Sequence, residues 1–189
     1  IEVPIKCQGG LRGAMKKSDS DAFTRLMAFL TSTRPGAQEQ GEEGIFLQID
    51  GTWELTGQGG KFDLAELFAN LHLLFDEDVI AHLEGASITE DVKSFLRSRP
   101  APVTTVLITQ TLFPRPEVYH LPATCDNLAA LADLARSHAP GEICSHFHVY
   151  KADRVLLDFC DVPSSEVYVS PEVPEERIRR FCDAVGCEY

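Results

Sequence analysis

Side chains of alternating character over residues 141–161 constrain the fold of this chain more than any other feature. The segment reads GEICSHFHVYKADRVLLDFCD. Successive side chains of a β-strand point to opposite faces, so Cys144, His146 and His148 share one face while Phe147 lies on the other. A second alternating segment follows a short polar stretch. The pattern therefore predicts an antiparallel β-hairpin.

The length of the loop in this hairpin decides which side chains lie beside one another. A loop with an odd number of residues, such as 151–153, joins the apolar side chains of both strands into one face, namely Phe147, Val149, Val155, Leu157 and Phe159. A shift of one residue turns every side chain to the opposite face, so we expect the hydrophobic pattern to select the odd register. The other face then gathers five potential metal ligands: Cys144, His146, His148, Asp158 and Cys160.

Helical and strand patterns are intermixed along the rest of the chain. Their periodicities predict helices at 18–32, 62–75, 87–99, 126–139 and 174–185, a hairpin at 44–57, and strands at 78–85, 103–113, 117–122 and 165–170. Paired strands with short turns imply antiparallel neighbours. The sequence therefore predicts an α+β fold in which a mixed or mainly antiparallel sheet packs against about five helices.

Several of these helices carry start or stop signals. Asp63 is the expected N-cap of helix 62–75, and Ser87 with Glu90 forms a capping box for helix 87–99. Pro174 and Gly186 bracket the last helix. Helix 62–75 has one apolar stripe, formed by Leu64, Leu67, Phe68, Leu71, Leu74 and Phe75, and His72 lies off it. We expect the stripe to be buried and His72 to lie at the surface.

The length of 189 residues suits one compact domain, so we expect a single domain over 1–189. Residues 1–17 show little periodicity and are interpreted as an N-terminal arm. Residues 33–44, rich in Gly, Gln and Glu, are interpreted as a flexible loop.

Charge and hydropathy exclude several classes of partner. The net charge of −12 would repel nucleic acid and anionic lipid. The apolar runs are far shorter than the roughly 20 residues of a membrane-spanning helix, and no basic segment leads into an apolar stretch at the start of the sequence. We therefore expect a soluble, cytoplasmic protein that binds neither nucleic acid nor membranes.

The six cysteines form no C-x-x-C motif, and the expected state is mostly buried free thiols. Cys182 and Cys187 flank a helix end, so a secreted protein with this pair oxidised is one alternative. Catalytic motifs are also missing: GQGGK at 57–61 lacks the spacing of a phosphate-binding loop, and neither G-x-S-x-G nor G-x-G-x-x-G occurs.

Three interpretations of the polar hairpin face therefore stand. It is an ordinary hydrogen-bonding surface, or a zinc site made of its N, O and S donors, or an acid/base site in which Asp158 orients His146. Tyr119 and His120 join the same surface if strand 117–122 is a neighbour. The first interpretation implies an acidic binding or interaction protein with no cofactor, whose partner is a protein or a small molecule. The others imply a metal-binding protein or a hydrolase-type enzyme.

Overall fold

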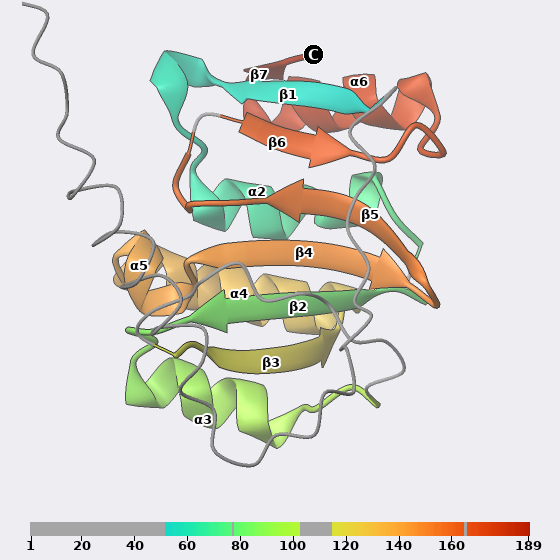
Figure 1. Ribbon diagram of the computed structural model, residues 1–189. Helices are drawn as coiled ribbons and strands as arrows, with labels where there is room; N and C mark the ends of the chain where they lie inside the picture. Colours follow the sequence, from blue (N-terminus) through green and yellow to red (C-terminus); the bar gives the residue numbers. More distant parts are fainter. Residues whose placement is uncertain (1–51, 77, 103–114, 165) are drawn as a thin grey trace, which may run out of the picture. The chain divides into compact units, whose positions relative to one another are not determined.

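The computed structural model describes residues 52–76, 78–102, 115–164 and 166–189 (Figure 1). The chain divides into two units, 1–41 and 42–189, and every described residue belongs to the second. The single-domain organisation over 1–189 therefore stays a prediction. Other expectations lie outside the described residues: the arm 1–17, the helix 18–32, the loop 33–44, the first arm of the hairpin 44–57 and the strand 103–113.

Seven strands of the described part form one sheet in the order β3-β2-β4-β5-β6-β1-β7, and each pair of neighbours is antiparallel. The strands are β1 (Trp53–Gly57), β2 (Ile80–Gly85), β3 (Glu117–Pro122), β4 (His146–Lys151), β5 (Arg154–Phe159), β6 (Glu166–Val169) and β7 (Cys187–Glu188). Strands 32 or more residues apart along the chain thus become direct neighbours, as β2 does with β3 and β4.

Five α-helices accompany the sheet in the same part of the chain: α2 (Leu64–Asn70), α3 (Glu90–Ser98), α4 (Cys125–Ser137), α5 (Pro140–Ile143) and α6 (Glu175–Val185). Helices α2, α4 and α6 lie on one face of the sheet, whereas α3 lies beside β3 at its edge (Figure 1). The expected α+β class with a mainly antiparallel sheet is confirmed. None of the described helices has both the length and the apolar character needed to cross a membrane.

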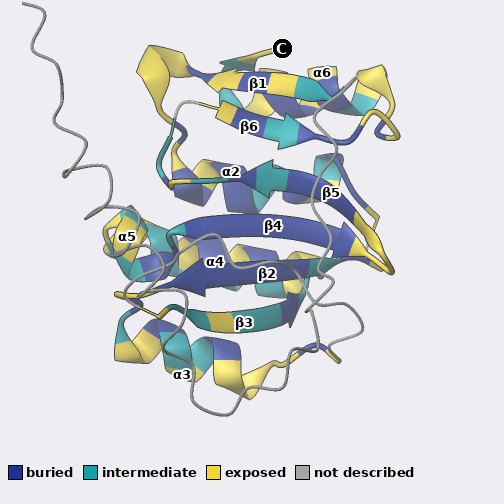
Figure 2. Cartoon of the chain, in the orientation of Figure 1, coloured by how far each residue is buried: buried dark blue, intermediate teal, exposed yellow. Residues whose placement is uncertain are grey.

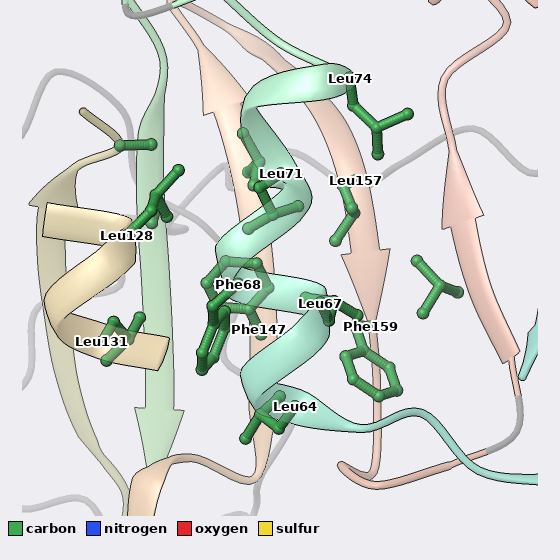
Figure 3. Close-up of a cluster of buried hydrophobic side chains, with 14 of the residues drawn as sticks. Leu64, Leu67, Phe68, Leu71, Leu74, Leu128, Leu131, Phe147, Leu157 and Phe159 are labelled. Atoms are coloured by element: carbon green, nitrogen blue, oxygen red, sulfur yellow. The ribbon is translucent and has the colours of Figure 1, made fainter. Parts of the chain in front are cut away.

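Helix α2 begins at the cap that the sequence predicts, but it ends at Asn70, and a 3₁₀ helix (Leu71–Leu73) replaces the last part of the predicted helix 62–75. Asp63 Oδ1 accepts hydrogen bonds from the backbone N–H groups of Ala65 at 2.9 Å and Glu66 at 3.3 Å. The stripe is buried, and Figure 3 shows it packing on strand side chains such as Phe147. The rings of Phe68 and Phe147 meet edge to face with centroids 5.0 Å apart. His72 is exposed, as expected.

The ends of α6 and α3 test the other helix start and stop signals of the sequence. Helix α6 has Pro174 at its N-cap and Gly186 in the left-handed region at φ 73°, as the sequence indicates. The capping box at Ser87 is wrong, because α3 begins at Glu90 with Thr89 as its N-cap. Ile88, just before that cap, is buried in the core, so the chain reaches the helix two residues later than the motif suggests.

The β4–β5 hairpin has a shorter loop than expected and a compensating bulge. Lys151 pairs with Arg154 across a two-residue turn, so the expected three-residue loop is wrong. The register then shifts between Val149 and Tyr150, which leaves one extra residue on β5. Beyond the bulge Val149 pairs with Leu157, which is the register of an odd loop. The bulge therefore restores the expected faces for all but the first residues of β5.

Val155 is the residue whose face was predicted incorrectly. It pairs with Tyr150 rather than joining Phe147, and it packs with Tyr150 and Ile80 in a small separate apolar cluster. Leu157 and Phe159 do join the main core, as expected. Burial is most complete in the middle of the sheet, where β2 and β4 are buried along nearly their whole length (Figure 2).

Candidate metal centre on the polar face of the sheet

The face of the sheet opposite the helices carries a row of polar side chains. We define the polar row as His120 on β3, His82 on β2, His148 on β4 and Asp158 on β5, each of which lies directly opposite the next. Residues paired in this way point to the same side of a sheet. Since the neighbouring Phe147 packs on α2, the polar row lies on the other side.

The centre of this face is buried. His82 is 1% exposed and His148 is 5% exposed, and the adjacent Glu84 and His146 are 0% and 6% exposed. Antiparallel sheets often leave one face to water, and burying polar groups costs free energy unless they are hydrogen-bonded. Burying a row of imidazoles therefore stabilises the fold less than burying apolar side chains at the same positions would. Such an arrangement points to a function for these groups.

Hydrogen bonds link His82, His148 and Asp158 of the polar row into a chain. His82 Nδ1 lies 3.1 Å from His148 Nδ1, and His148 Nε2 lies 3.0 Å from Asp158 Oδ1. Cys160 donates its thiol hydrogen to the same carboxylate oxygen over 2.9 Å. Because a carboxylate only accepts, His148 Nε2–H is the donor to Asp158. In its neutral form His148 then accepts through Nδ1 from the Nδ1–H of His82.

The local environment fixes the charge of three of these groups. Burial lowers the pKa of His82 to about 2, with smaller contributions from His148 and His120. Burial likewise lowers the pKa of His120. For Asp158 burial raises the pKa, but the hydrogen bonds from His148 and Cys160 outweigh it and the net shift is downward. Near neutral pH His82 and His120 are therefore neutral and Asp158 is ionised, which is the state in which a carboxylate ligates a metal.

Three of these side chains converge closely enough to hold one metal ion. Ligand atoms of His148, Asp158 and Cys160 all lie within 4.8 Å of one another. In a tetrahedral zinc site, bond lengths of about 2.0–2.3 Å place neighbouring ligand atoms about 3.4–3.6 Å apart. The observed 3.0 Å and 2.9 Å to Asp158 Oδ1 need only small side-chain movements to reach that spacing. One N, one O and one S donor form a set that suits zinc.

Two of the five ligands expected from the sequence lie elsewhere. Cys144 is fully buried in the hydrophobic core, where burial raises the pKa of its thiol. It ends α5, and β4 begins only at His146, so the strand alternation does not extend to it. His146 stays on the polar face but turns to the loop after β5. There it accepts the backbone N–H of Asp161 at Nδ1 over 3.1 Å.

That hydrogen bond fixes the tautomer of His146. A backbone N–H can only donate, so Nδ1 carries the lone pair and the neutral ring holds its proton on Nε2. Nε2 faces the Asp161 carboxylate at 4.0 Å. Asp161 adopts a positive φ of 51°, which asparagine and aspartate tolerate better than most residues. Asp158 therefore orients His148 rather than His146. His146 is held instead by the backbone N–H of Asp161.

The strand 117–122 is a neighbour, so it contributes His120 but not Tyr119. His120 Nδ1 lies 2.8 Å from Tyr150 Oη, and its ring is edge to face with His82 at 5.1 Å. Tyr119 points to the opposite side, where it packs against the core and donates to Glu117 at 2.5 Å. Glu117 also pairs with Lys93 of α3. Tyr119 therefore belongs to the contact between α3 and β3.

Sequence reasoning missed His82, although a signal was present. In the strand segment DVIAHLEG, His82 and Glu84 alternate with Ala81 and Leu83, as His146 and His148 alternate with Phe147. Each segment thus has one apolar and one polar face. What the sequence does not provide is the pairing of β2 with β4, which joins residues 66 positions apart.

A small cavity on the other face contrasts with this cluster. Its walls are mostly apolar and come from the segment after α2, from α4 and from the core side of β4, with Leu71, Phe75 and Leu128 among them. Ligand sites usually combine such walls with a few convergent polar groups. The buried side chains of His82, Glu84, His146 and His148 lie instead on the polar face, which is where the candidate chemistry lies.

In comparisons with protein-family models, curated proteins and solved structures, nothing matches this chain significantly.

Proposed function

We propose that the protein binds one divalent transition-metal ion, zinc in the first place, through His148, Asp158 and Cys160. The observation that supports this most strongly is the convergence of three chemically different ligand atoms within 4.8 Å on adjacent strands. Two of the ligands are cross-strand partners, so regular sheet geometry holds them. The third follows two residues after Asp158 and contacts the same carboxylate oxygen.

Metal binding requires one rearrangement of protons, and the neighbouring groups allow it. His148 must give up the proton on Nε2 to coordinate, and its neutral ring then carries a proton on Nδ1. His82 Nδ1, 3.1 Å away, accepts that hydrogen bond in its other neutral tautomer. A second hydrogen bond of this kind orients a metal-bound imidazole and raises its basicity. Cys160 must likewise lose its thiol hydrogen, so binding releases protons and weakens as pH falls.

Three protein ligands are the number found in catalytic zinc sites, where water occupies the fourth position. Zinc-bound water ionises near neutral pH and acts as a nucleophile. The proposal is thus compatible with both the metal-binding and the hydrolase-type interpretations of the sequence. The proposed function is metal binding itself.

The test is elemental analysis of protein purified without a histidine tag or chelator, followed by titration with zinc. We expect stoichiometric zinc, and we expect His148→Ala, Asp158→Asn and Cys160→Ser each to lower its content. Cobalt gives a second readout, since a thiolate-to-cobalt charge-transfer band should appear and vanish in Cys160→Ser. His72→Ala and Cys125→Ser are matched controls, because both side chains are exposed and lie away from the polar face.

Two results would contradict the proposal. One is metal-free protein that gains no stability from added zinc. The other is zinc content that His72→Ala reduces as much as His148→Ala does. Either would return the polar row to a purely structural hydrogen-bonding role and leave an acidic, non-catalytic interaction protein, with a protein or small-molecule partner, as the better proposal.

A further inference from the structure

A second group of reactive side chains lies at the end of α6, far from the polar row in the strand order. The helix closes with Gly186 at φ 73°, and the Gly186 N–H donates to the carbonyl of Cys182 over 2.8 Å. In this left-handed cap, the residue after the glycine commonly packs against the residue whose carbonyl accepts that bond. Those two residues are Cys187 and Cys182. The cap itself therefore brings two cysteines together.

The two thiols interact with each other at this cap. This contact lowers the pKa of Cys187 and, together with burial, raises that of Cys182. Cys182 is 4% exposed in the core, whereas Cys187 is half-buried. Cys187 thus has the lower pKa of the two and is also the one that solvent can reach. A cysteine with both properties is reactive.

We propose that Cys182 and Cys187 form a redox-active dithiol, which a small-molecule disulfide such as oxidised glutathione converts into an intramolecular disulfide. The Cys187 thiolate attacks one sulfur of the reagent, forms a mixed disulfide and expels one thiolate. Cys182 then loses its proton and attacks the Cys187 sulfur, which expels the second thiolate. The protein loses two electrons and two protons, and the reagent becomes two thiols. This proposal does not depend on the metal site.

The disulfide fixes a short edge strand to the helix. Strand β7 has only two residues and pairs with β1 at Gly57 and Thr56. So short a strand is expected to fray when nothing else holds it. Beyond it, Tyr189 packs on Trp53 with ring centroids 5.8 Å apart. Oxidation should hold these last residues on β1, while reduction should let them open and expose the β1 edge.

The full-length protein can be tested directly with oxidised glutathione. Cleavage after Arg180 releases residues 181–189, which contain both cysteines and no internal basic residue. We expect this peptide to lose the mass of two hydrogens without a lasting glutathione adduct. In Cys182→Ser we expect a persistent adduct on Cys187, and in Cys187→Ser we expect Cys182 to stay unmodified. Cys125 is exposed and reports that the reagent is active.

A second measurement separates the dithiol from general thiol reactivity. Amide hydrogen exchange of residues 187–189 should slow after oxidation in the wild-type protein and stay unchanged in Cys187→Ser. The proposal is overturned if the C-terminal peptide keeps both thiols, or carries adducts on both, while Cys125 reacts. It is also overturned if the disulfide forms but exchange at the C-terminus does not change.

Discussion

The two faces of the sheet are both buried at β2 and β4, yet opposite kinds of side chain occupy them. On the helix side Phe147 packs against Phe68 of α2, and both Phe147 and Val149 belong to the continuous apolar core. On the other side His82 and His148 are as well buried, but they are linked to Asp158 by hydrogen bonds. The same two strands therefore separate an apolar interior from a polar one.

This difference separates stability from function. Burying an apolar side chain of this size stabilises the fold by about 1.5–3 kcal/mol. A buried hydrogen-bonded polar pair contributes about 1 kcal/mol net, and it becomes costly when one partner is lost. The helix side is thus the part that makes the chain fold. The polar side contributes less to stability, and we propose that it binds a metal ion.

The largest effect should come from the helix side. Leu67 is fully buried on α2, so Leu67→Ala should lower the free energy of unfolding by about 2–5 kcal/mol. Glu66→Ala on the exposed side of the same helix should change it by less than about 0.5 kcal/mol. Urea denaturation midpoints measure both. Equal midpoints for Leu67→Ala and the wild-type protein would show that this face is not the stabilising one.

An intermediate effect should come from the polar side, and only with metal present. Zinc at a hundredfold excess over its dissociation constant should stabilise the wild-type protein by about 2.7 kcal/mol. Asp158→Asn should abolish this gain, whereas Leu67→Ala should keep it despite its lower baseline stability. Thermal unfolding with and without zinc measures the difference. If both variants lose the gain, the two faces are not separable.

The smallest effects should appear in the titration of the histidines of metal-free protein. Burial lowers the pKa of His82 and His120, whereas the Leu134 carbonyl and Asp91 raise the pKa of His138 at the end of α4. NMR should therefore find that His82 stays neutral well below pH 6.5, that His120 titrates below 6.5 and that His138 titrates above it. Asp91→Asn should lower the pKa of His138 and leave His82 unchanged.

These directions have opposite consequences for stability. For His82 and His120 the unfolded chain takes up protons that the folded chain refuses, so stability falls as pH drops below about 6.5, by up to about 1.4 kcal/mol per pH unit for each group. His138 contributes stability below about pH 6.5, and that contribution is lost as pH rises through its folded pKa. A stability profile that stays flat between pH 6.5 and 4 would contradict burial of the two histidines as neutral groups.

The parts of this structure that the sequence predicts are those set by local periodicity. The apolar stripe of α2, the cap at Asp63 and the shared face of His148 and Asp158 all follow from spacing within one or two adjacent elements. The bulge after Val149 was not foreseen, because an extra residue leaves the overall pattern of the hairpin intact. It changed the face of Val155 and little else.

The missing parts depend on contacts between distant elements. His82 joins His148 only because β2 lies beside β4, and no local pattern determines that order. In the sequence, Cys144 continues the alternation of β4. In the structure it is the C-cap of α5, and its side chain is buried in the core. The pairing of Cys187 with β1 involves a strand of two residues, which is too short to leave a periodic signal.

The most direct measurement of the metal site is anomalous X-ray scattering at the zinc edge from crystals of zinc-loaded protein. We expect one strong peak within about 2.0–2.3 Å of His148 Nε2, an Asp158 oxygen and Cys160 Sγ, and no such peak in crystals of Asp158→Asn. A fully occupied zinc ion elsewhere on the protein, or no ordered zinc at saturating concentration, would contradict the proposal that the polar face of the sheet is a metal centre.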